Sequence, residues 1–465
     1  WTLMSVTTWI DEALAGASGH GTVVIVHDST QANLRWANNA LTTNGQMHAR
    51  SASVIALADV EGGIATGCLS GPVTQASDLA DLVRRASELA SASVPGEDPV
   101  DLVGAVVDAD YTAGPEPTSI EVLADVASGL GRAFDAARAA DHLLFGFAEH
   151  VATTTWLATS TGVRRRSVNR GGTLELNAKH PDMIGSAWVG RATQDFTDVD
   201  LDEVHAEVVK RLGWCETRLE LPAGPYETIL PPSAVADLMI YAYWTMNGRD
   251  AREGRNVYAG PTVGQTRVGE VLSRLPVNLW SDPSEPTLPS APFAVVASSE
   301  PGLSSVFDNG LDVGRVDWIT EGRLASLVET RAEWAKSGGS GSLPFPTDNL
   351  LCDAGGDASI DEMVASTKRG LLLTCLWYIR EVDPQTLLLT GLTRDGVYLV
   401  EDGEVVGMVN NFRWNESPVD LLRRASEFGR SEVVLCREWN DWFTKTRMPP
   451  MRVPDFAMST VSLAY

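Results

Sequence analysis

The sequence feature that most restricts the fold is a long β pattern over residues 142–193, which contains no segment with helical spacing. Apolar and polar side chains alternate along it, as they do in strands with one buried face. Glycine-containing segments at 160–162 and 170–172 supply turn residues. The pattern therefore predicts a β-meander with turns at those two places.

Segments before and after this meander predict further strands and long helices in the first part of the chain. Strands are expected at 21–29, at 32–46 with a turn at Asn44-Gly45, and on both sides of Gly62-Gly63 within 48–70; helices are expected at 119–140 and 200–217. This part of the chain is therefore predicted to be an α/β domain with a mixed sheet and long helices.

A proline-rich stretch at 220–232 marks a domain boundary, because 465 residues exceed what one ordinary core accommodates. We expect an N-terminal α/β domain at 4–218 and a β-rich C-terminal domain at 219–465, which together give an α+β protein. In the second domain, Asp402-Gly403 predicts a hairpin over 396–409. Helices are predicted at 231–248 and at 359–370, each ending at a glycine.

The charge and the cysteine content indicate the compartment and exclude some partners. The formal net charge of -25 disfavours nucleic acid as a partner, since phosphates would be repelled. The most apolar run, 371–379, is too short to span a bilayer, and no signal peptide is recognisable. Five scattered cysteines without a CxxC pair indicate a reducing compartment, so we expect a cytoplasmic protein without membrane contact.

Residues able to carry catalysis are unevenly distributed along the chain. All seven histidines precede residue 206, so a zinc site with histidine ligands cannot be built from the second domain alone. No nucleotide-binding or hydrolase motif is present, and no cofactor is expected in this chain. Of the later cysteines, Cys375 is expected to be buried, whereas the exposure of Cys352 is left open. The tightest polar cluster in the first domain, His27-Asp28-Ser29, is expected at a strand end.

The segment 239–260 combines an apolar hexamer, MIYAYW, with a glycine-punctuated loop. Met239 and Ile240 lie in the predicted helix and are expected to be mostly buried. The segment resembles the metal-site region of the TldD/PmbA family, H-E-x-x-x-H-G-L-E-G-D-x-x-R-x-G-x-S-x-F-x-G. Without a gap, the chain supplies Gly248, Arg252, Gly254, an aromatic residue at Tyr258, and Gly260. Similar blocks at 23–45, 221–239, 348–374 and 390–422 extend the resemblance over most of residues 20–465.

The departures from the family pattern are informative. In the active subunits of this family, two histidines and a later cysteine bind zinc, and the glutamate is the general base. Here Met239, Ile240 and Trp244 occupy the His, Glu and His positions, and Cys436 falls only loosely near the family cysteine. The resemblance therefore implies a degenerate site without catalytic or metal-binding residues.

By that resemblance the chain is the non-catalytic, TldE/PmbA-type subunit of a heterodimeric zinc metallopeptidase. Zinc is expected in the partner, a TldD-like H-E-x-x-x-H subunit, and the substrate is expected to be an unfolded peptide bound by strand addition. One alternative is a stand-alone homodimeric peptide-binding protein without catalysis. A modulator of DNA gyrase, an older name in the family, is disfavoured by the charge, and an enzyme that uses first-domain histidines is the remaining alternative.

Overall fold

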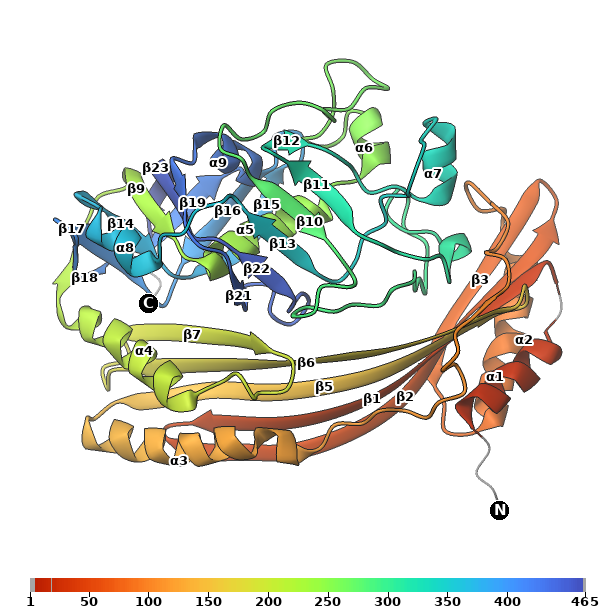
Figure 1. Ribbon diagram of the computed structural model, residues 1–465, viewed down its shortest axis with the longest axis horizontal. Helices are drawn as coiled ribbons and strands as arrows, with labels where there is room; N and C mark the ends of the chain where they lie inside the picture. Colours follow the sequence, from red (N-terminus) through yellow and green to blue (C-terminus); the bar gives the residue numbers. More distant parts are fainter. Residues whose placement is uncertain (1–4, 18, 463–465) are drawn as a thin grey trace.

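The computed structural model describes residues 5–17 and 19–462, so the predicted start of the first domain at Met4 lies outside the described residues. A long curved sheet with helices beside it forms the first half of the chain (Figure 1). A second half, rich in short strands and loops, lies over one face of that sheet (Figure 1). Both halves mix helices with sheets, which confirms the α+β class. The division at residue 219 stays a prediction.

The first sheet contains seven strands among the described residues, and its central strands are unusually long. Its order is β3-β2-β1-β5-β6-β4, with β7 also paired to β6; only the β4–β6 pairing is parallel. The sheet is therefore mixed, as expected. The strands are β1 (Gly21–Ala37), β2 (Ala40–Val60), β3 (Gly63–Pro72), β4 (Val106–Val107), β5 (Leu143–Thr159), β6 (Val163–Lys179) and β7 (Ser186–Thr193).

Two predicted turns are wrong, because the strands run straight through them. Asn44 and Gly45 pair with Leu34 and Asn33 inside the β1–β2 ladder. The real turn is at Asn38 and Asn39, whose φ angles of 52° and 59° are those that a tight hairpin requires. The segment 170–172 lies within β6, and a Cβ on its last glycine would come within 2.5 Å of the Phe196 ring. That glycine therefore serves close packing and not a turn.

The turn at 160–162 is confirmed, and so is the pair of strands around Gly62-Gly63. The cluster His27-Asp28-Ser29 is not at a strand end, because β1 continues to Ala37. The helices of this half are α1 (Val6–Ala15), α2 (Ala76–Ala92), α3 (Ala124–Ala139) and α4 (Leu201–Gly213). Helices α3 and α4 lie at one end of the sheet and α1 and α2 at the other (Figure 1).

Two further sheets build the second half. In the described part of the chain, one has six strands: β10 (Asn278–Ser281), β11 (Val316–Thr320), β12 (Arg323–Leu324), β13 (Leu350–Asp353), β21 (Glu432–Val434) and β22 (Thr446–Met448). The other has ten: β8 (Arg218–Leu219), β9 (Gly224–Leu230), β14 (Arg369–Leu373), β15 (Leu376–Asp383), β16 (Leu388–Thr393), β17 (Val397–Glu401), β18 (Glu404–Val409), β19 (Phe412–Glu416), β20 (Glu427–Phe428) and β23 (Met451–Val461). The hairpin at Asp402-Gly403 is confirmed.

The helices of the second half are short except for one: α5 (Pro232–Trp244), α6 (Gly248–Arg252), α7 (Arg331–Lys336), α8 (Ile360–Ala365) and α9 (Pro418–Arg424). Two predicted helix ends are wrong. The helix at 231–248 ends at Trp244, and Gly248 begins α6, which Asn247 caps. The helix at 359–370 ends at Ala365, because Gly370 pairs with Val400 as part of β14.

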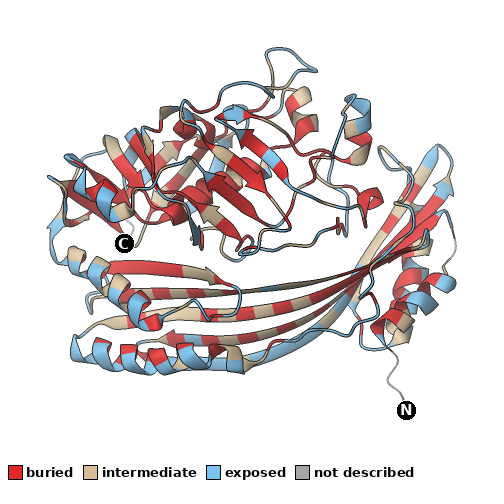
Figure 2. Ribbon diagram, viewed as in Figure 1, coloured by how far each residue is buried: buried red, intermediate tan, exposed pale blue. Residues whose placement is uncertain are grey.

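The two halves share apolar cores. Val23, Leu57 and Leu157 of the first sheet pack in one cluster with Phe293 and Phe307 of the second half. A second cluster joins residues of α3 and α4 to residues of β14 and β17. Figure 2 shows buried residues along the sheets and through the second half, whereas the outer faces of α3 and α4 are exposed. The interface between the halves is therefore part of the folded core.

Candidate degenerate metal site

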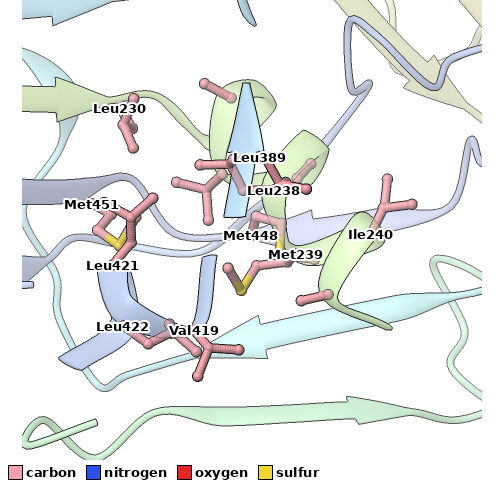
Figure 3. Close-up of a cluster of buried hydrophobic side chains, with 14 of the residues drawn as sticks. Leu230, Leu238, Met239, Ile240, Leu389, Val419, Leu421, Leu422, Met448 and Met451 are labelled. Carbon is pink, nitrogen blue, oxygen red and sulfur yellow. The ribbon is translucent and has the colours of Figure 1, made fainter. Parts of the chain in front are cut away.

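Helix α5 is buried on every side. Eleven of its thirteen residues are buried, and it contacts strands of both C-terminal sheets. The structure confirms that Met239 and Ile240 are buried, with exposed fractions of 1% and 0%. Both belong to an apolar cluster that also contains Leu389, Met448 and Met451, and Figure 3 shows the two side chains leaving α5 in different directions. Met239 and Ile240 therefore stabilise the core through apolar packing.

The third degenerate position, Trp244, lies at the end of α5 and is 38% exposed. Its ring packs edge-on against Trp439 and Phe443, with centroids 5.2 and 6.4 Å apart, and Trp439 also contacts Tyr241. Aromatic rings in such arrangements attract each other through the edge and face of their π systems. Trp244 therefore holds the segment 436–443 against the helix.

Cys436 begins that segment and is fully buried. Its thiol donates a hydrogen bond to the Phe443 carbonyl oxygen at 3.2 Å. Burial raises the pKa of the Cys436 thiol well above its ordinary value, so the thiolate that a metal would need is disfavoured. The structure thus brings Cys436 close to α5, but as a packed thiol.

The sequence reasoning missed the carboxylate that organises this region, Asp237. It is fully buried on α5 and accepts hydrogen bonds from the backbone N–H groups of Glu438, at 2.9 Å, and Arg437, at 3.3 Å. Its own carbonyl oxygen accepts from Trp439 Nε1 at 2.9 Å. Burial raises its pKa. A signal was available, since Asp237 is the only charged residue between Glu227 and Arg249.

Glu438 extends this arrangement to the edge strand β15. Its carboxylate accepts hydrogen bonds from the N–H groups of Tyr378 and Ile379, each at 2.9 Å. Tyr378 has a φ of 53°, which is uncommon for a residue with a side chain. Together, Asp237 and Glu438 tie α5, the segment 436–443 and β15 into one unit.

The family-like residues that follow α5 have structural roles. A Cβ on Gly248 would lie 2.1 Å from a carboxylate oxygen of Glu329, and Arg252 donates to that same carboxylate and to Glu333. The Tyr258 hydroxyl donates to the Ala242 carbonyl oxygen at 2.9 Å, which fixes the loop on α5. Gly254 has a φ of 76°. These residues therefore fix the loop that follows α5 in place.

The residues at the degenerate positions do not fit zinc. A thioether, an alkyl chain and an indole ring lack the imidazole and carboxylate donors that Zn²⁺ prefers, and the nearby thiol is buried as a hydrogen-bond donor. In residues 5–17 and 19–462, no group of three or more His, Cys, Asp or Glu side chains is placed to hold a metal ion.

The other candidate residues are buried or have partners in neighbouring strands. Cys375 is buried as expected, and Cys352, whose exposure the sequence left open, is buried as well. The first-domain cluster is held by partners in neighbouring strands: His27 contacts Thr155 at 2.9 Å, and Asp28 binds Arg50 and His48. No described helix combines the length and apolar character needed to cross a membrane.

Comparison with known proteins gives one family and several similar structures. The sequence model described as the PmbA/TldA metallopeptidase C-terminal domain matches residues 223–460. TldE from Thermococcus kodakarensis has a similar structure, with a TM-score of 0.77 at 15% identity over 98% of this chain and 99% of that one. A search among curated proteins finds no match.

Two proteins named as proposed modulators of DNA gyrase also have similar structures. The one from Thermotoga maritima has a TM-score of 0.70 at 16% identity, over 97% of this chain and 100% of that one. The one from Bacteroides thetaiotaomicron has a TM-score of 0.73 at 13% identity, over 98% of each chain. At these identities the structures establish a shared fold along nearly the whole chain.

Proposed function

Because the chain belongs to the PmbA/TldD metallopeptidase family, we propose that it is the non-catalytic, TldE-type subunit of a heterodimeric zinc metallopeptidase that cleaves unfolded peptides. The observation that carries this proposal is the burial of Met239 and Ile240 in the core, at positions where the family has a zinc ligand and a general base. Zinc and the base would come from an H-E-x-x-x-H partner.

The chain would contribute surfaces that hold an extended backbone. Among the described strands, β3 pairs only with β2, and β15 pairs only with β16, so each has an edge without a strand partner, although Glu438 already accepts from the N–H groups of Tyr378 and Ile379 on β15. Open edges bind extended peptides through main-chain hydrogen bonds, with little dependence on side chains. Such recognition suits unfolded substrates of varied sequence.

An exposed aromatic surface lies beside the degenerate site. The Trp442 side chain is 79% exposed, and its backbone N–H donates to the Trp439 carbonyl oxygen at 2.8 Å. Tyr378, held by Glu438, is also exposed. Exposed tryptophan and tyrosine are enriched where proteins bind partners. We propose that this surface, Trp442 and Tyr378, contacts the catalytic subunit or its bound peptide.

The first experiment is elemental analysis of the purified chain. The purified chain should contain no stoichiometric zinc, because Met239, Ile240 and Trp244 offer neither an imidazole nor a carboxylate to the metal. The Cys436→Ser variant should give the same result. One zinc per chain that disappears in Cys436→Ser would overturn the proposal.

The decisive experiment is reconstitution with the H-E-x-x-x-H homologue from the same genome. The chain alone should show no peptidase activity, whereas the mixture should form a heterodimer and cleave disordered peptides but not folded proteins. Proline in the substrate should reduce cleavage, because it removes a backbone donor. Trp442→Ser should weaken complex formation, while Val94→Ser, at a position equally exposed on the first half, should not.

Two outcomes separate the alternatives. If the homologue cleaves equally well without this chain and the two elute separately, the subunit role fails. A homodimer that then binds peptides without cleaving them would support the stand-alone peptide-binding protein.

A further inference from the structure

Lys445 is a buried cation at the junction of the two halves. It immediately precedes β22, and only 8% of it is exposed. Its Nζ donates hydrogen bonds to the Asn169 side-chain oxygen on β6 and to the Pro289 carbonyl oxygen. Both acceptors are neutral. By contrast, Lys210 and Lys336, which are more exposed, form ion pairs with aspartates.

A buried ammonium group with neutral partners is unfavourable unless a negative charge neutralises it. Burial accordingly lowers the pKa of Lys445 to about 8, although the charge of Asp348 opposes this. At neutral pH the amine is still mostly protonated. An ammonium group has three N–H donors, and the two hydrogen bonds leave one donor for another acceptor.

A cavity of about 310 Å³ lies beside this amine, between the two halves. Residues of β6, β7 and the loops around Pro289 and Thr444 line it, together with Lys445 itself. Its volume is within the range of small-ligand sites, which often occur between domains. Two carboxylates also line it, but both are engaged: Asp195 accepts from the Thr197 N–H and hydroxyl, and Asp198 accepts from the Thr193 hydroxyl.

We propose that this cavity binds a carboxylate-bearing ligand, whose anionic group pairs with the Lys445 ammonium. Arg170 also lines the cavity but forms an ion pair with Glu116, so a single carboxylate matches Lys445, whose two hydrogen-bond acceptors are neutral. A dianion such as phosphate is disfavoured, because Asp195 and Asp198 would repel its second charge. The carboxylate could belong to a small organic acid or to the C-terminus of a peptide. The inference concerns this chain alone and is independent of the proposed subunit role.

The test is calorimetric titration of the chain with N-acetylglycine and with N-acetylglycinamide, its neutral analogue, near pH 7. The acid should bind about tenfold tighter than the amide, since the charge-assisted hydrogen bond is available only to the acid. Lys445→Met, which keeps an unbranched apolar stem, should remove this preference. Lys336→Met, at an exposed lysine, should leave it unchanged.

A second pair of probes, acetyl-tetraglycine and its amide, distinguishes the sources. Acid preference with both ligand lengths indicates a small-acid site, and acid preference with the longer pair alone indicates a peptide C-terminus. Either result supports carboxylate recognition. Equal affinities of acid and amide at both lengths would overturn it, as would an acid preference that persists in Lys445→Met.

A measurement on the unaltered chain covers the case in which Lys445→Met does not fold. Acetylation by acetic anhydride can be followed by mass spectrometry at each of the five lysines, Lys179, Lys210, Lys336, Lys368 and Lys445. The acid that binds should slow acetylation at Lys445 and leave the other four unchanged. Acetylation of Lys445 at the same rate with and without the acids would contradict the proposal.

Discussion

Helices α4 and α5 have the same length, thirteen residues, but they are built in opposite ways. Helix α4 buries only Leu201, Val204, Val208 and Leu212, at the spacing of one helical face. Its first turn is acidic and its last turn basic, as the helix dipole favours. Helix α5 buries eleven residues and has a single charged side chain, Asp237.

This difference shows where each helix takes its stability from. An amphipathic helix such as α4 is stabilised partly by its own N-cap and by charges at its ends, and it buries only one face against a neighbouring element. A helix that is apolar all round depends on neighbours on every side, so its positions tolerate polar groups only where partners exist. In α5 two buried polar side chains have partners: Asp237 accepts from Arg437 and Glu438, and the Tyr243 hydroxyl donates to the Thr347 carbonyl oxygen. Met239 and Ile240 are accordingly core positions.

The largest expected effect is that of a carboxylate introduced into α5. Ile240→Glu should lower the free energy of unfolding by about 2–4 kcal/mol, because the carboxylate would be buried without a partner. It should create no peptidase activity. Ala206→Glu, at an exposed position of α4, should change stability by less than about 0.5 kcal/mol. Equal denaturant midpoints for Ile240→Glu and the unaltered chain would refute buried packing at α5.

Removal of the Asp237 carboxylate from α5 should have the next largest effect. Asp237→Ala leaves the N–H groups of Arg437 and Glu438 without their acceptor, which should cost about 1–3 kcal/mol. The matched change on α4, Asp202→Ala, breaks an exposed ion pair with Arg132 and should cost less. Urea unfolding of both variants measures the difference, and a larger loss for Asp202→Ala would contradict it.

Loss of the N-cap of α4 should have a smaller effect. The Asp200 carboxylate accepts from the N–H groups of Asp202 and Glu203, so Asp200→Ala should cost about 1 kcal/mol. Asp200→Asn preserves an acceptor and should retain most of the stability. Thermal melts would show this order. Identical melts for Ala and Asn at this position would mean that the cap does not stabilise α4.

The smallest expected effect is on the pH dependence of stability. Helix α4 contains a histidine, His205, that can titrate near neutral pH, whereas α5 contains none. Burial lowers the pKa of His205, and His142 lowers it further, although Asp202 opposes this. The folded state therefore favours the neutral ring. The resulting stabilisation is present above the unfolded pKa of 6.5 and is lost as pH falls through the lowered folded pKa.

His205→Gln should therefore flatten the acid limb of the stability curve below pH 6.5. His20→Gln, at a more exposed histidine beside Asp59, is the control. Unfolding midpoints measured across this range give the slopes. The prediction is wrong if His205→Gln and the unaltered chain lose stability with the same slope.

Much of the fold could be predicted from residues whose local preference and tertiary role agree. The buried face of α4, the hairpin at Asp402-Gly403 and the burial of Met239 and Ile240 follow from spacing or turn chemistry. The turns predicted at Asn44-Gly45 and at 170–172 failed. At Asn44-Gly45 the chain continues its pairing with β1, and at Gly172 the missing side chain allows close packing against Phe196.

The sequence by itself determined the family frame and the side chains at 239, 240 and 244, because Met, Ile and Trp supply neither an imidazole nor a carboxylate in any fold. Only the tertiary structure decided that Asp237 anchors the segment 436–443, and that Lys445 lies buried beside a cavity between the two halves. The physical reason is distance along the chain. Asp237 and Glu438 are joined by a hydrogen bond, as are Lys445 and Asn169, and no local pattern encodes contacts between residues so far apart in sequence.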